Sequence, residues 1–275
     1  MNTNYSLTIN DWLSKSEKIL KANKINSSRL DCLILLEFVL NKSRVHVLSE
    51  TNQKLDNKDI IKLDKYIHLR KNHLPIAYIT NSIDFFRRNF YINQNVLIPR
   101  PETEEIISQA LKLNLSNVMN IADIGCGSGC IGITLALELP EKNVDLYDID
   151  DQAIGVAVKN CSNHNLKLNT YKSDLLLNMK SDYDLIVCNL PYVPNNLDVS
   201  DEVKSEPKIA VFSGHDGMKL YRTFWKQINI LNFKPKYIIT ESLISQHDLM
   251  NQLAINSGYK LVSINNLIQT FSLAA

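Results

Sequence analysis

The sequence predicts an α/β protein in which a doubly wound, mainly parallel sheet follows a small helical domain. Beyond residue 101, strand segments rich in β-branched residues alternate with helical segments, which is typical of a parallel sheet with helices on both faces. Before residue 75, apolar residues recur at helical spacing in three segments. The 275 residues, of which 45% are hydrophobic, suffice for one large or two ordinary domains.

Three helices are predicted for the first domain. The first starts at Thr8 or Asn10, Ser27 or Ser28 caps the second in "RLDCLILLEFVLN", and the third is "NKDIIKLDKYIHLRK". The following segments, "PIAYIT" and "IDFFRRNFYINQNVLIP", are rich in aromatic and β-branched residues and predict a linking β-hairpin. We therefore expect a helical domain at 1–74, a linker with a hairpin at 75–100 and the sheet domain at 101–275.

The sheet domain starts with the helix "PETEEIISQALKL" and then alternates strands and helices. The expected strands are "VMNIADIG", "NVDLYDI", "NTYKSD", "YDLIVCN", "KYIITES", "YKLVSI" and "LIQTFSLA". The expected helices are the one that starts at Gly129, "DQAIGVAVKNCSNHN", "MKLYRTFWKQINIL" and "ISQHDLMNQLAINS". In such a sheet, ligands bind outside the carboxyl ends of the strands.

Composition excludes several classes of protein. No apolar run approaches the roughly 18 residues of a membrane span, and "MNTNYSLTIN" lacks the pattern of a signal peptide, so we expect a cytoplasmic protein without a membrane partner. The five cysteines form no C-x-x-C pair, and the six histidines show no ligand spacing, so no metal is expected. Residues 1–90 carry 15 Lys/Arg against 9 Asp/Glu. This surplus of positive charge is either a solvated surface or steers an acidic or nucleic-acid-associated partner.

A glycine loop, Gly125–Gly129, lies between the first predicted strand of the sheet and the next helix. In "ADIGCGSG" its spacing is G-x-G-x-G, with Asp123 two residues before the first glycine. Glycines let the backbone turn sharply and approach a ligand, and the free amides at a helix start attract anionic groups. Asp148 closes the next strand, where a carboxylate can accept both hydroxyl protons of a ribose. The pattern implies a nucleoside ligand, and it resembles motif I of the S-adenosylmethionine-dependent methyltransferases.

A stiff, amide-bearing corner, "NLPY" at Asn189–Tyr192, follows the fourth strand; we call it the NLPY corner. An amide or exocyclic amine nitrogen is a poor nucleophile because its lone pair is delocalised, so it must be oriented. The Asn189 oxygen and a backbone carbonyl of Leu190-Pro191 can accept the two N–H bonds and aim the lone pair at a methyl donor. Proline holds such carbonyls rigidly, and the Tyr192 ring can pack on the planar group. Positioning then carries the rate without a strong base.

The NLPY corner resembles the [DNS]-P-P-[YFW] signature of methyltransferases that act on amino groups of planar substrates. Leu190 departs from it, since a proline is expected there. An Asn-Leu-Pro-Tyr version is familiar from ribosomal RNA adenine dimethyltransferases, so this motif alone leaves both an RNA base and a protein amide open as substrates. Only the backbone carbonyl of Leu190 is needed for the expected hydrogen bond.

The order of several segments is similar to that of the HemK/PrmC family. These segments are "PIAYIT", "VLIPRPETEEII", "DIGCGSG", "NLPYVP" and "SEPKIAVFSGHDGMKLYR", and the resemblance runs from about residue 28 to about residue 264. It implies a class I S-adenosylmethionine-dependent methyltransferase fold with a seven-stranded sheet. It also implies transfer of methyl to the N5 amide nitrogen of the Gly-Gly-Gln glutamine in class 1 peptide chain release factors, which the helical domain helps to dock. We expect a monomer, S-adenosyl-L-homocysteine as product and no nucleic-acid substrate.

The resemblance also implies roles for individual residues. Leu175 would lie near adenine, as would Asp174, for which a helix N-cap is an equally good interpretation. Arg100 would lie near the cofactor and substrate, although a surface salt bridge would satisfy it too. The cofactor-binding set is Asp123, Gly125, Cys126, Gly127, Ser128, Gly129, Asp148, Asp174, Leu175 and Asn189; the substrate set is Arg100, Asn189, Leu190, Pro191 and Tyr192, of which Asn189, Pro191 and Tyr192 are the expected catalytic residues.

Alternatives remain at this point. An N6-adenine methyltransferase acting on RNA or DNA is favoured by Leu190 and the basic first third, but the chain lacks the strong positive balance of a nucleic-acid binder. A non-catalytic protein that binds release factors or ribosomes is disfavoured by the intact glycine loop, Asp148 and the NLPY corner. A nicotinamide dehydrogenase would have a different glycine spacing. Asn81, where a glycine is usual, is a further departure from the family pattern.

Overall fold

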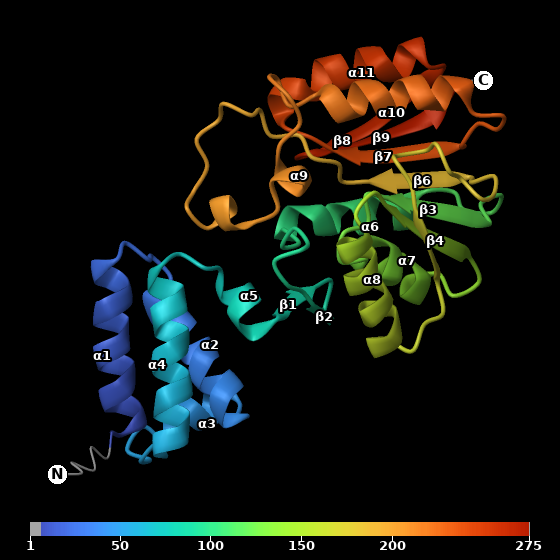
Figure 1. Ribbon diagram of the computed structural model, residues 1–275. Helices are drawn as coiled ribbons and strands as arrows, with labels where there is room; N and C mark the ends of the chain where they lie inside the picture. The colour runs from blue at the N-terminus through green and yellow to red at the C-terminus, as the bar shows by residue number, and fades with distance from the viewer. Residues whose placement is uncertain (1–6, 275) are drawn as a thin grey trace. The chain divides into compact units, whose positions relative to one another are not determined.

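The computed structural model describes residues 7–274, and the chain divides into two compact units (Figure 1). A helical unit contains the described residues up to Asn81 together with the short segment Ser200–Ser205. A sheet unit contains Ser82–Val199 and the residues from Glu206 on. These bounds differ from the expected ones in two respects: the hairpin belongs to the sheet unit, and a segment distant in sequence joins the helical unit.

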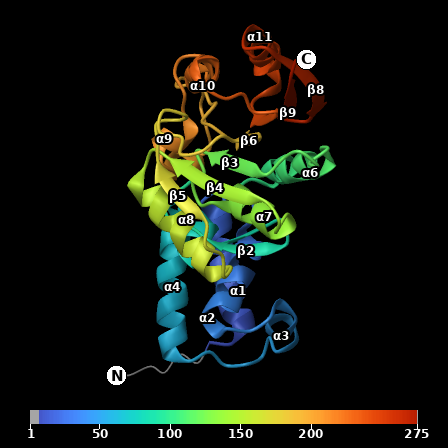
Figure 2. The same cartoon turned by 90° about the vertical axis from the view of Figure 1, so that its right-hand side faces the viewer.

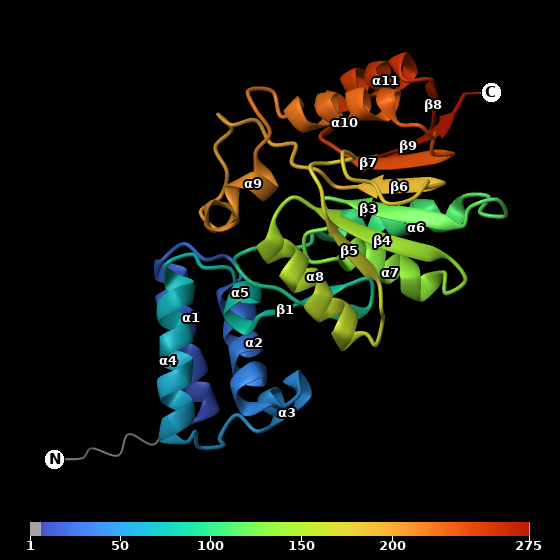
Figure 3. The same cartoon turned by 45° about the vertical axis from the view of Figure 1, so that its right-hand side comes forward.

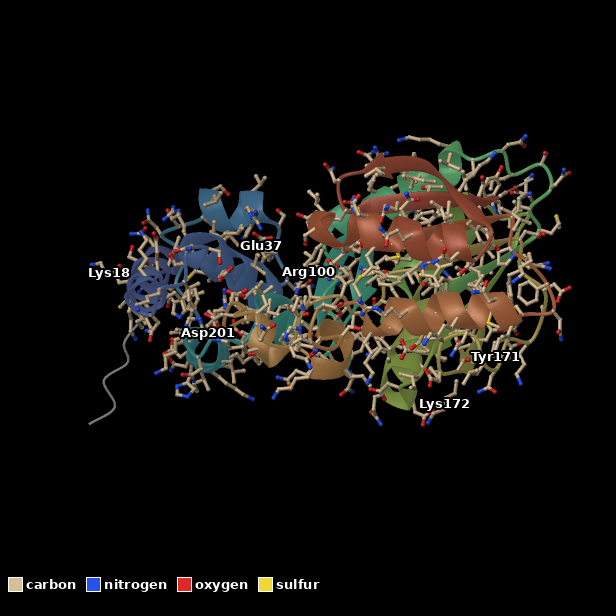
Figure 4. All side chains as sticks on the ribbon, turned by 90° about the horizontal axis from the view of Figure 1, so that it is seen from above. Lys18, Glu37, Arg100, Tyr171, Lys172 and Asp201 are labelled. Atoms are coloured by element: carbon tan, nitrogen blue, oxygen red, sulfur yellow. The ribbon has the colours of Figure 1, made fainter. Side chains whose placement is uncertain are left out.

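The helical unit consists of α1 (Ile9–Ala22), α2 (Ser28–Leu40), α3 (Arg44–Ser49), α4 (Asn57–Lys71) and α5 (Ile76–Thr80). Thr8 caps α1 in a capping box with Asp11, as its side-chain oxygen and that of Asp11 accept each other's backbone N–H. Trp12 and the other apolar side chains of α1, α2 and α4 form one core. Figure 4 labels two polar side chains of this unit, Lys18 of α1 and Glu37 of α2.

The sequence prediction for "PIAYIT" was wrong, because this segment is the short helix α5 and not part of a hairpin. Its residues from Ala77 to Thr80 are buried, so tertiary packing overrides their β propensity. Asn81 ends the helix with a φ of 54°, a left-handed conformation that favours glycine and that asparagine tolerates. The asparagine at this position is therefore a compatible replacement for glycine. The helix α3 was not predicted.

A buried ion cluster joins the segment Ser200–Ser205 to the helices of its own unit. Arg70 of α4 is 1% exposed and donates from Nε to Asp31 of α2 at 2.6 Å. Its Nη2 pairs with Glu202. Burying a guanidinium is costly unless it is paired, and Glu202 provides a second negatively charged partner for Arg70. This contact joins residues 132 positions apart in the chain.

The sheet unit contains a seven-stranded, mainly parallel sheet, which confirms the predicted fold class. Its order is β5-β4-β3-β6-β7-β9-β8, and β9 runs antiparallel to both of its neighbours, β7 and β8, whereas the other pairs are parallel (Figures 2 and 3). The strands are β3 (Asn120–Ile124), β4 (Asn143–Asp148), β5 (Asn169–Lys172), β6 (Leu185–Cys188), β7 (Tyr237–Glu241), β8 (Tyr259–Asn265) and β9 (Ile268–Leu273). Figure 4 labels Tyr171 and Lys172, which lie on the edge strand β5.

Helices cover both faces of this sheet, and alternate residues of each central strand enter two different cores. The helices α6 (Glu104–Lys112), α7 (Cys130–Glu138) and α8 (Asp151–Asn163) lie on one face, and α10 (Lys219–Ile230) and α11 (His247–Asn256) lie on the other (Figures 1 and 3). Leu185 and Val187 of β6 join the first core, whereas Ile186 and Cys188 join the second. This period of two follows from the pleat of a strand that is buried on both sides.

The predicted hairpin is present as β1 (Ser82–Phe85) and β2 (Arg88–Tyr91). Its Phe85 and Phe90 join the core on the α7 side of the sheet. Asn160 of α8 is fully buried and bonds both the backbone N–H and the carbonyl of Tyr91, and its Nδ2 also donates to the Ser128 carbonyl. The hairpin is thus fixed to the glycine loop through one side chain. Within residues 7–274, no helix is both long and apolar enough to cross a membrane.

Candidate active site

A cavity opens at the carboxyl ends of β3, β4 and β6, the edge at which the sheet architecture predicts a ligand. The space within it is about 1030 Å³, open mouth included. Its lining comes from the sheet unit and includes five groups of residues: Asn95–Leu97, Gly125–Ser128, Asp148–Ile149, Ser173–Leu175 and Asn189–Pro191. Most of the predicted site residues therefore meet here.

The glycine loop leaves β3 and turns sharply into α7. Gly125, Gly127 and Gly129 have φ values of 71°, 54° and 78°, a left-handed conformation in which glycine is favoured. A Cβ at Gly127 would meet no atom within 4 Å, so the backbone there borders open space. Gly129 is the N-cap of α7 and does not line the cavity. The loop thus presents bare backbone to a ligand.

Asp123 lies beneath the glycine loop and does not line the cavity. It is fully buried, and its Oδ2 accepts the Gly132 backbone N–H at 2.8 Å. A Cβ at Gly132 would lie 2.2 Å from Leu146 and 3.0 Å from the Asp123 Cβ, so this close approach requires glycine. Burial raises the pKa of the Asp123 carboxyl to about 7. The geometry gives Asp123 a supporting role under the loop.

Asp148 ends β4 at the rim of the cavity. Its Oδ2 accepts the Gly127 backbone N–H at 2.8 Å and its Oδ1 accepts the Asp150 backbone N–H at 3.0 Å. Burial raises the pKa of this carboxyl, and the neighbouring backbone N–H groups oppose the rise. Each carboxylate oxygen has room for a second donor, so both remain able to accept a ribose hydroxyl.

Ser173, Asp174 and Leu175 follow β5 and line the cavity. Leu175 is buried and has a φ of 52°, an uncommon conformation for a leucine. The Ser173 hydroxyl donates to the Leu175 carbonyl at 2.8 Å and stabilises this turn. Asp174 is exposed, and within residues 7–274 its side chain does not cap a helix. Leu175 can thus present an apolar face to an adenine ring.

The NLPY corner is held by contacts from several elements. The Leu190 backbone N–H donates to the Tyr221 hydroxyl of α10 at 3.3 Å, and the Tyr221 hydroxyl donates to the Glu241 carbonyl at 2.6 Å. The Leu190 side chain is 2% exposed and packs on the glycine loop, since a Cβ at Gly125 would lie 3.0 Å from its Cδ2. Leu190 therefore joins the two motifs by van der Waals contact.

The Asn189 side chain has one end fixed by the protein. Its Nδ2 donates to the Thr103 hydroxyl oxygen at 3.1 Å. Asn189, Leu190 and Pro191 all line the cavity. Among residues 7–274, no donor reaches the Asn189 Oδ1 or the carbonyl oxygens of Leu190 and Pro191. These acceptors are available to a ligand that carries two N–H bonds.

Tyr192 is held by hydrogen bonds to both its side chain and its backbone. Its hydroxyl donates to Glu241 Oε1 at 2.8 Å, and its carbonyl accepts the Gln246 Nε2 amide at 2.8 Å. Burial raises the pKa of the Tyr192 hydroxyl, and the nearby Glu241 carboxyl raises it further. A Cβ at Gly217 would lie 2.0 Å from the Tyr192 carbonyl oxygen, so this position requires glycine.

Arg100 does not line the cavity. It pairs with Glu206, which is 5% exposed and also accepts the Ile98 backbone N–H at 3.2 Å (Arg100 is labelled in Figure 4). The salt bridge proposed as an alternative is thus present. Glu206 lies where the chain returns to the sheet unit after Ser200–Ser205, so the pair fixes that return.

Sequence reasoning missed Glu241, Gln246, Gly217 and the hydroxyl of Thr103. Glu241 had a detectable signal, since it ends a central strand next to β6, and the rule that selected Asp148 and Asn189 selects it too. Gln246 and Thr103 act through hydrogen bonds to residues far away in the sequence, which no local pattern predicts. Among the described residues, no group of three or more metal-ligating side chains is present.

Two family models match the chain. The model described as "PrmC N-terminal domain" matches residues 11–80, and "Methyltransferase small domain" matches residues 103–206. Solved structures that are less than 25% identical in sequence to this chain share the fold of the sheet unit. The hMettl16 catalytic domain superposes with a TM-score of 0.55 at 15% identity, covering 81% of this chain and 84% of that one. A methyltransferase from Pyrococcus furiosus gives 0.52 at 14%, covering 77% and 98%.

Several relatives are similar over most of this chain. "Release factor glutamine methyltransferase" from Clostridium botulinum is 36% identical over 82% of this chain and 83% of its own. The protein of the same name from Mycoplasma mycoides is 35% identical over 88% and 89%. A "Bifunctional methyltransferase" from Rickettsia typhi is 34% identical over 91% of this chain, which spans 54% of that protein. The chain belongs to the release factor glutamine methyltransferase family.

Proposed function

We propose that the protein transfers the methyl group of S-adenosyl-L-methionine to the N5 amide nitrogen of the Gly-Gly-Gln glutamine in class 1 peptide chain release factors. Family membership supports the reaction and the type of substrate. The observation that carries it is the set of acceptors on the NLPY corner, the Asn189 Oδ1 and the Leu190 and Pro191 carbonyls, which border the cavity without an internal donor among the described residues. They suit a planar amide that has two N–H bonds to donate.

The cavity fits the cofactor. S-adenosylmethionine supplies an electrophilic methyl on a sulfonium centre. The glycine loop offers bare backbone for the methionine moiety, Asp148 offers carboxylate oxygens for the ribose hydroxyls, and Leu175 offers an apolar face for adenine. Gly125 and Leu190 are in contact, so the loop and the NLPY corner border the same space. A methyl donor and an amide acceptor bound to these two motifs would therefore be neighbours.

The expected contribution of the chain to the rate is orientation. Accepting both N–H bonds of the glutamine amide would turn its lone pair toward the methyl donor and restrict rotation of the amide group. Pro191 fixes its own φ and keeps the corner stiff. The buried Tyr192 hydroxyl keeps its proton because its pKa is raised, so Tyr192 acts as a neutral ring and hydrogen-bond donor. Loss of a proton from nitrogen follows methyl transfer and needs no strong base.

We propose that the protein acts as a monomer. Release factors work at the ribosome, so we place the reaction in the cytoplasm. The helical unit matches a family model named for this family's N-terminal domain, and we propose that it helps to dock the release factor.

Mass spectrometry of the Gly-Gly-Gln peptide tests the proposal. Incubation of a release factor with the protein and S-adenosylmethionine should add one methyl group to the glutamine side chain. Asn189→Ala should lower the rate about a hundredfold, as expected for the loss of one preorganised polar contact. Labelling of RNA or DNA without labelling of the release factor would contradict the proposal and favour an adenine methyltransferase.

A further inference from the structure

Glu241 contacts the NLPY corner directly through its side chain and indirectly through its backbone carbonyl, by way of the Tyr221 hydroxyl. It ends β7, the strand next to β6, and it is 1% exposed. Its carbonyl accepts the Tyr221 hydroxyl, which in turn accepts the Leu190 backbone N–H. Its Oε1 accepts the Tyr192 hydroxyl at 2.8 Å. One residue therefore braces the second and the fourth residue of the corner.

The carboxyl of Glu241 also lies beside the fixed end of Asn189. Its surroundings include the Thr103 and Asn189 side chains, which lower its pKa, although burial has the larger effect and raises the pKa overall. Its Oε2 is buried and has no hydrogen-bond partner within residues 7–274. An ionised carboxylate is only an acceptor, so the group of Asn189 that faces it has to be the amide NH₂. The Asn189 Nδ2 donates to the Thr103 hydroxyl, which lies beside the same carboxyl.

We propose that Glu241 is a positioning residue that fixes which end of the Asn189 amide faces the cavity. The oxygen and nitrogen of an asparagine amide have nearly the same shape, so packing alone does not distinguish the two orientations. Thr103 does not distinguish them either, because a hydroxyl both donates and accepts. Glu241 is the neighbour that favours only one. This inference rests on the proposed function, in which the Asn189 Oδ1 accepts the N–H of the substrate amide.

A buried carboxylate oxygen without a partner is unfavourable for stability. Its retention beside the NLPY corner is consistent with a role in orienting Asn189. In the variant Glu241→Gln, the new side chain would be nearly the same size but would carry an NH₂ group. Because the Tyr192 hydroxyl donates to the oxygen at the Oε1 position, keeping that hydrogen bond leaves the NH₂ at the Oε2 position. There it would face either the Asn189 NH₂, which is repulsive, or the Asn189 oxygen after the Asn189 amide has turned by half a rotation. In the turned state a donor faces the substrate NH₂, so productive binding is lost.

The test compares Glu241→Gln with a matched control, Thr240→Val. Thr240 precedes Glu241 on β7, is fully buried and has an Oγ1 without a partner among the described residues, so both changes alter an unpaired buried polar atom on one strand. We expect Glu241→Gln to lower kcat for release factor methylation by about ten- to a hundredfold. The dissociation constant for S-adenosylmethionine, measured by calorimetry, should stay within about twofold, and Thr240→Val should retain wild-type kcat.

A double-mutant cycle separates positioning from general damage. In an Asn189→Ala background, Glu241→Gln should have no further effect on kcat, because the group it orients is absent. Multiplicative losses in the double variant would overturn the inference, as would equal losses from Glu241→Gln and Thr240→Val. Should Glu241→Gln fail to fold, Thr103→Val is measured instead. Because Glu241 and not Thr103 selects the orientation of the amide, this variant should lower kcat much less than Asn189→Ala does, and a loss as large as that of Asn189→Ala would overturn the inference.

A second measurement does not depend on the substrate. The side-chain ¹⁵N–¹H₂ resonances of Asn189, assigned by their loss in Asn189→Ala, should shift in Glu241→Gln and stay unchanged in Thr240→Val. An unchanged resonance in Glu241→Gln would overturn the inference even if activity falls. If the wild type methylates no release factor, the proposed function fails, while the resonance shift still decides whether Glu241 orients Asn189.

Discussion

Gly217→Ala is the sharpest test of how rigidly the NLPY corner must be held. The added Cβ would lie 2.0 Å from the Tyr192 carbonyl oxygen and 2.5 Å from the Gln246 Nε2, which donates to that oxygen. Cβ contacts closer than 3.0 Å essentially do not occur, so the Tyr192 backbone has to move by at least the difference, about 1 Å. A misplacement of about 1 Å in a catalytic group can reduce the rate about a hundredfold.

Gly214→Ala is the matched control for this change. Gly214 and Gly217 have φ values of 79° and 77°, so alanine is equally strained at both positions, by roughly 1–2 kcal/mol. The Cβ at Gly214 would meet the Lys219 Cβ at 3.1 Å and no part of the corner. We therefore expect similar losses of thermal stability that are dominated by backbone strain, with any excess in Gly217→Ala coming from the clash with Tyr192.

The assay is transfer of labelled methyl to a release factor at saturating concentrations of both substrates, below the melting temperature of each variant. Gly217→Ala should lower kcat about a hundredfold, and Gly214→Ala should lower it by less than about threefold. The reasoning is refuted if the two variants have equal kcat values. It is also refuted if Gly217→Ala keeps wild-type kcat, because the corner would then tolerate a shift of about 1 Å.

Three further predictions follow from the cavity and its support. Gly125 has a φ of 71°, and a Cβ there would lie 3.0 Å from Leu190, so Gly125→Ala should destabilise the protein by about 1–2 kcal/mol. A Cβ at Gly155 in α8 would meet open space, so Gly155→Ala should stabilise the protein by about 0.5–1 kcal/mol in thermal unfolding. Asp148→Asn should weaken S-adenosylmethionine binding by about ten- to a hundredfold in calorimetry, because the ribose hydroxyls lose a charged hydrogen-bond acceptor. An unchanged affinity would show that Asp148 does not bind the cofactor. The Asp123 carboxyl has a folded-state pKa of about 7 against 3.8 without burial, so the folded state keeps this proton to higher pH than the unfolded state does. The free energy of unfolding should therefore fall by about 4 kcal/mol as pH rises between these two pKa values. Denaturant titrations of Asp123→Asn should lack this decline, and pH profiles of variant and wild type that run parallel would contradict the prediction.

Much of the sheet unit is predictable from sequence because its signals are local and periodic. Strands buried on both faces read as short apolar runs, and their carboxyl ends carry the glycine loop, Asp148 and the NLPY corner. The parallel order then brings these three motifs to one edge. The helix Asn57–Lys71 was predicted with the bounds that the structure gives, because charged residues flank a clear apolar stripe.

The remainder depends on contacts between residues that are far apart in the chain. The one-turn helix α5 has the composition of a strand, and only its burial makes it helical. The supporting contacts of Gln246, Thr103 and Glu241 to the corner each join residues between 49 and 86 positions apart. The roles of the site residues themselves stay predictions that the variants above test.

The segment Ser200–Ser205 has a consequence for how such proteins can be recombined. Because this segment belongs to the helical unit, the chain passes between the two units three times, after Asn81, after Val199 and after Ser205. A chimera that exchanges only the residues up to 81 would remove Arg70 and leave Glu202 without the guanidinium it pairs with. A working exchange between relatives therefore has to carry two separate stretches of sequence, and substitutions in them are expected to be inherited together.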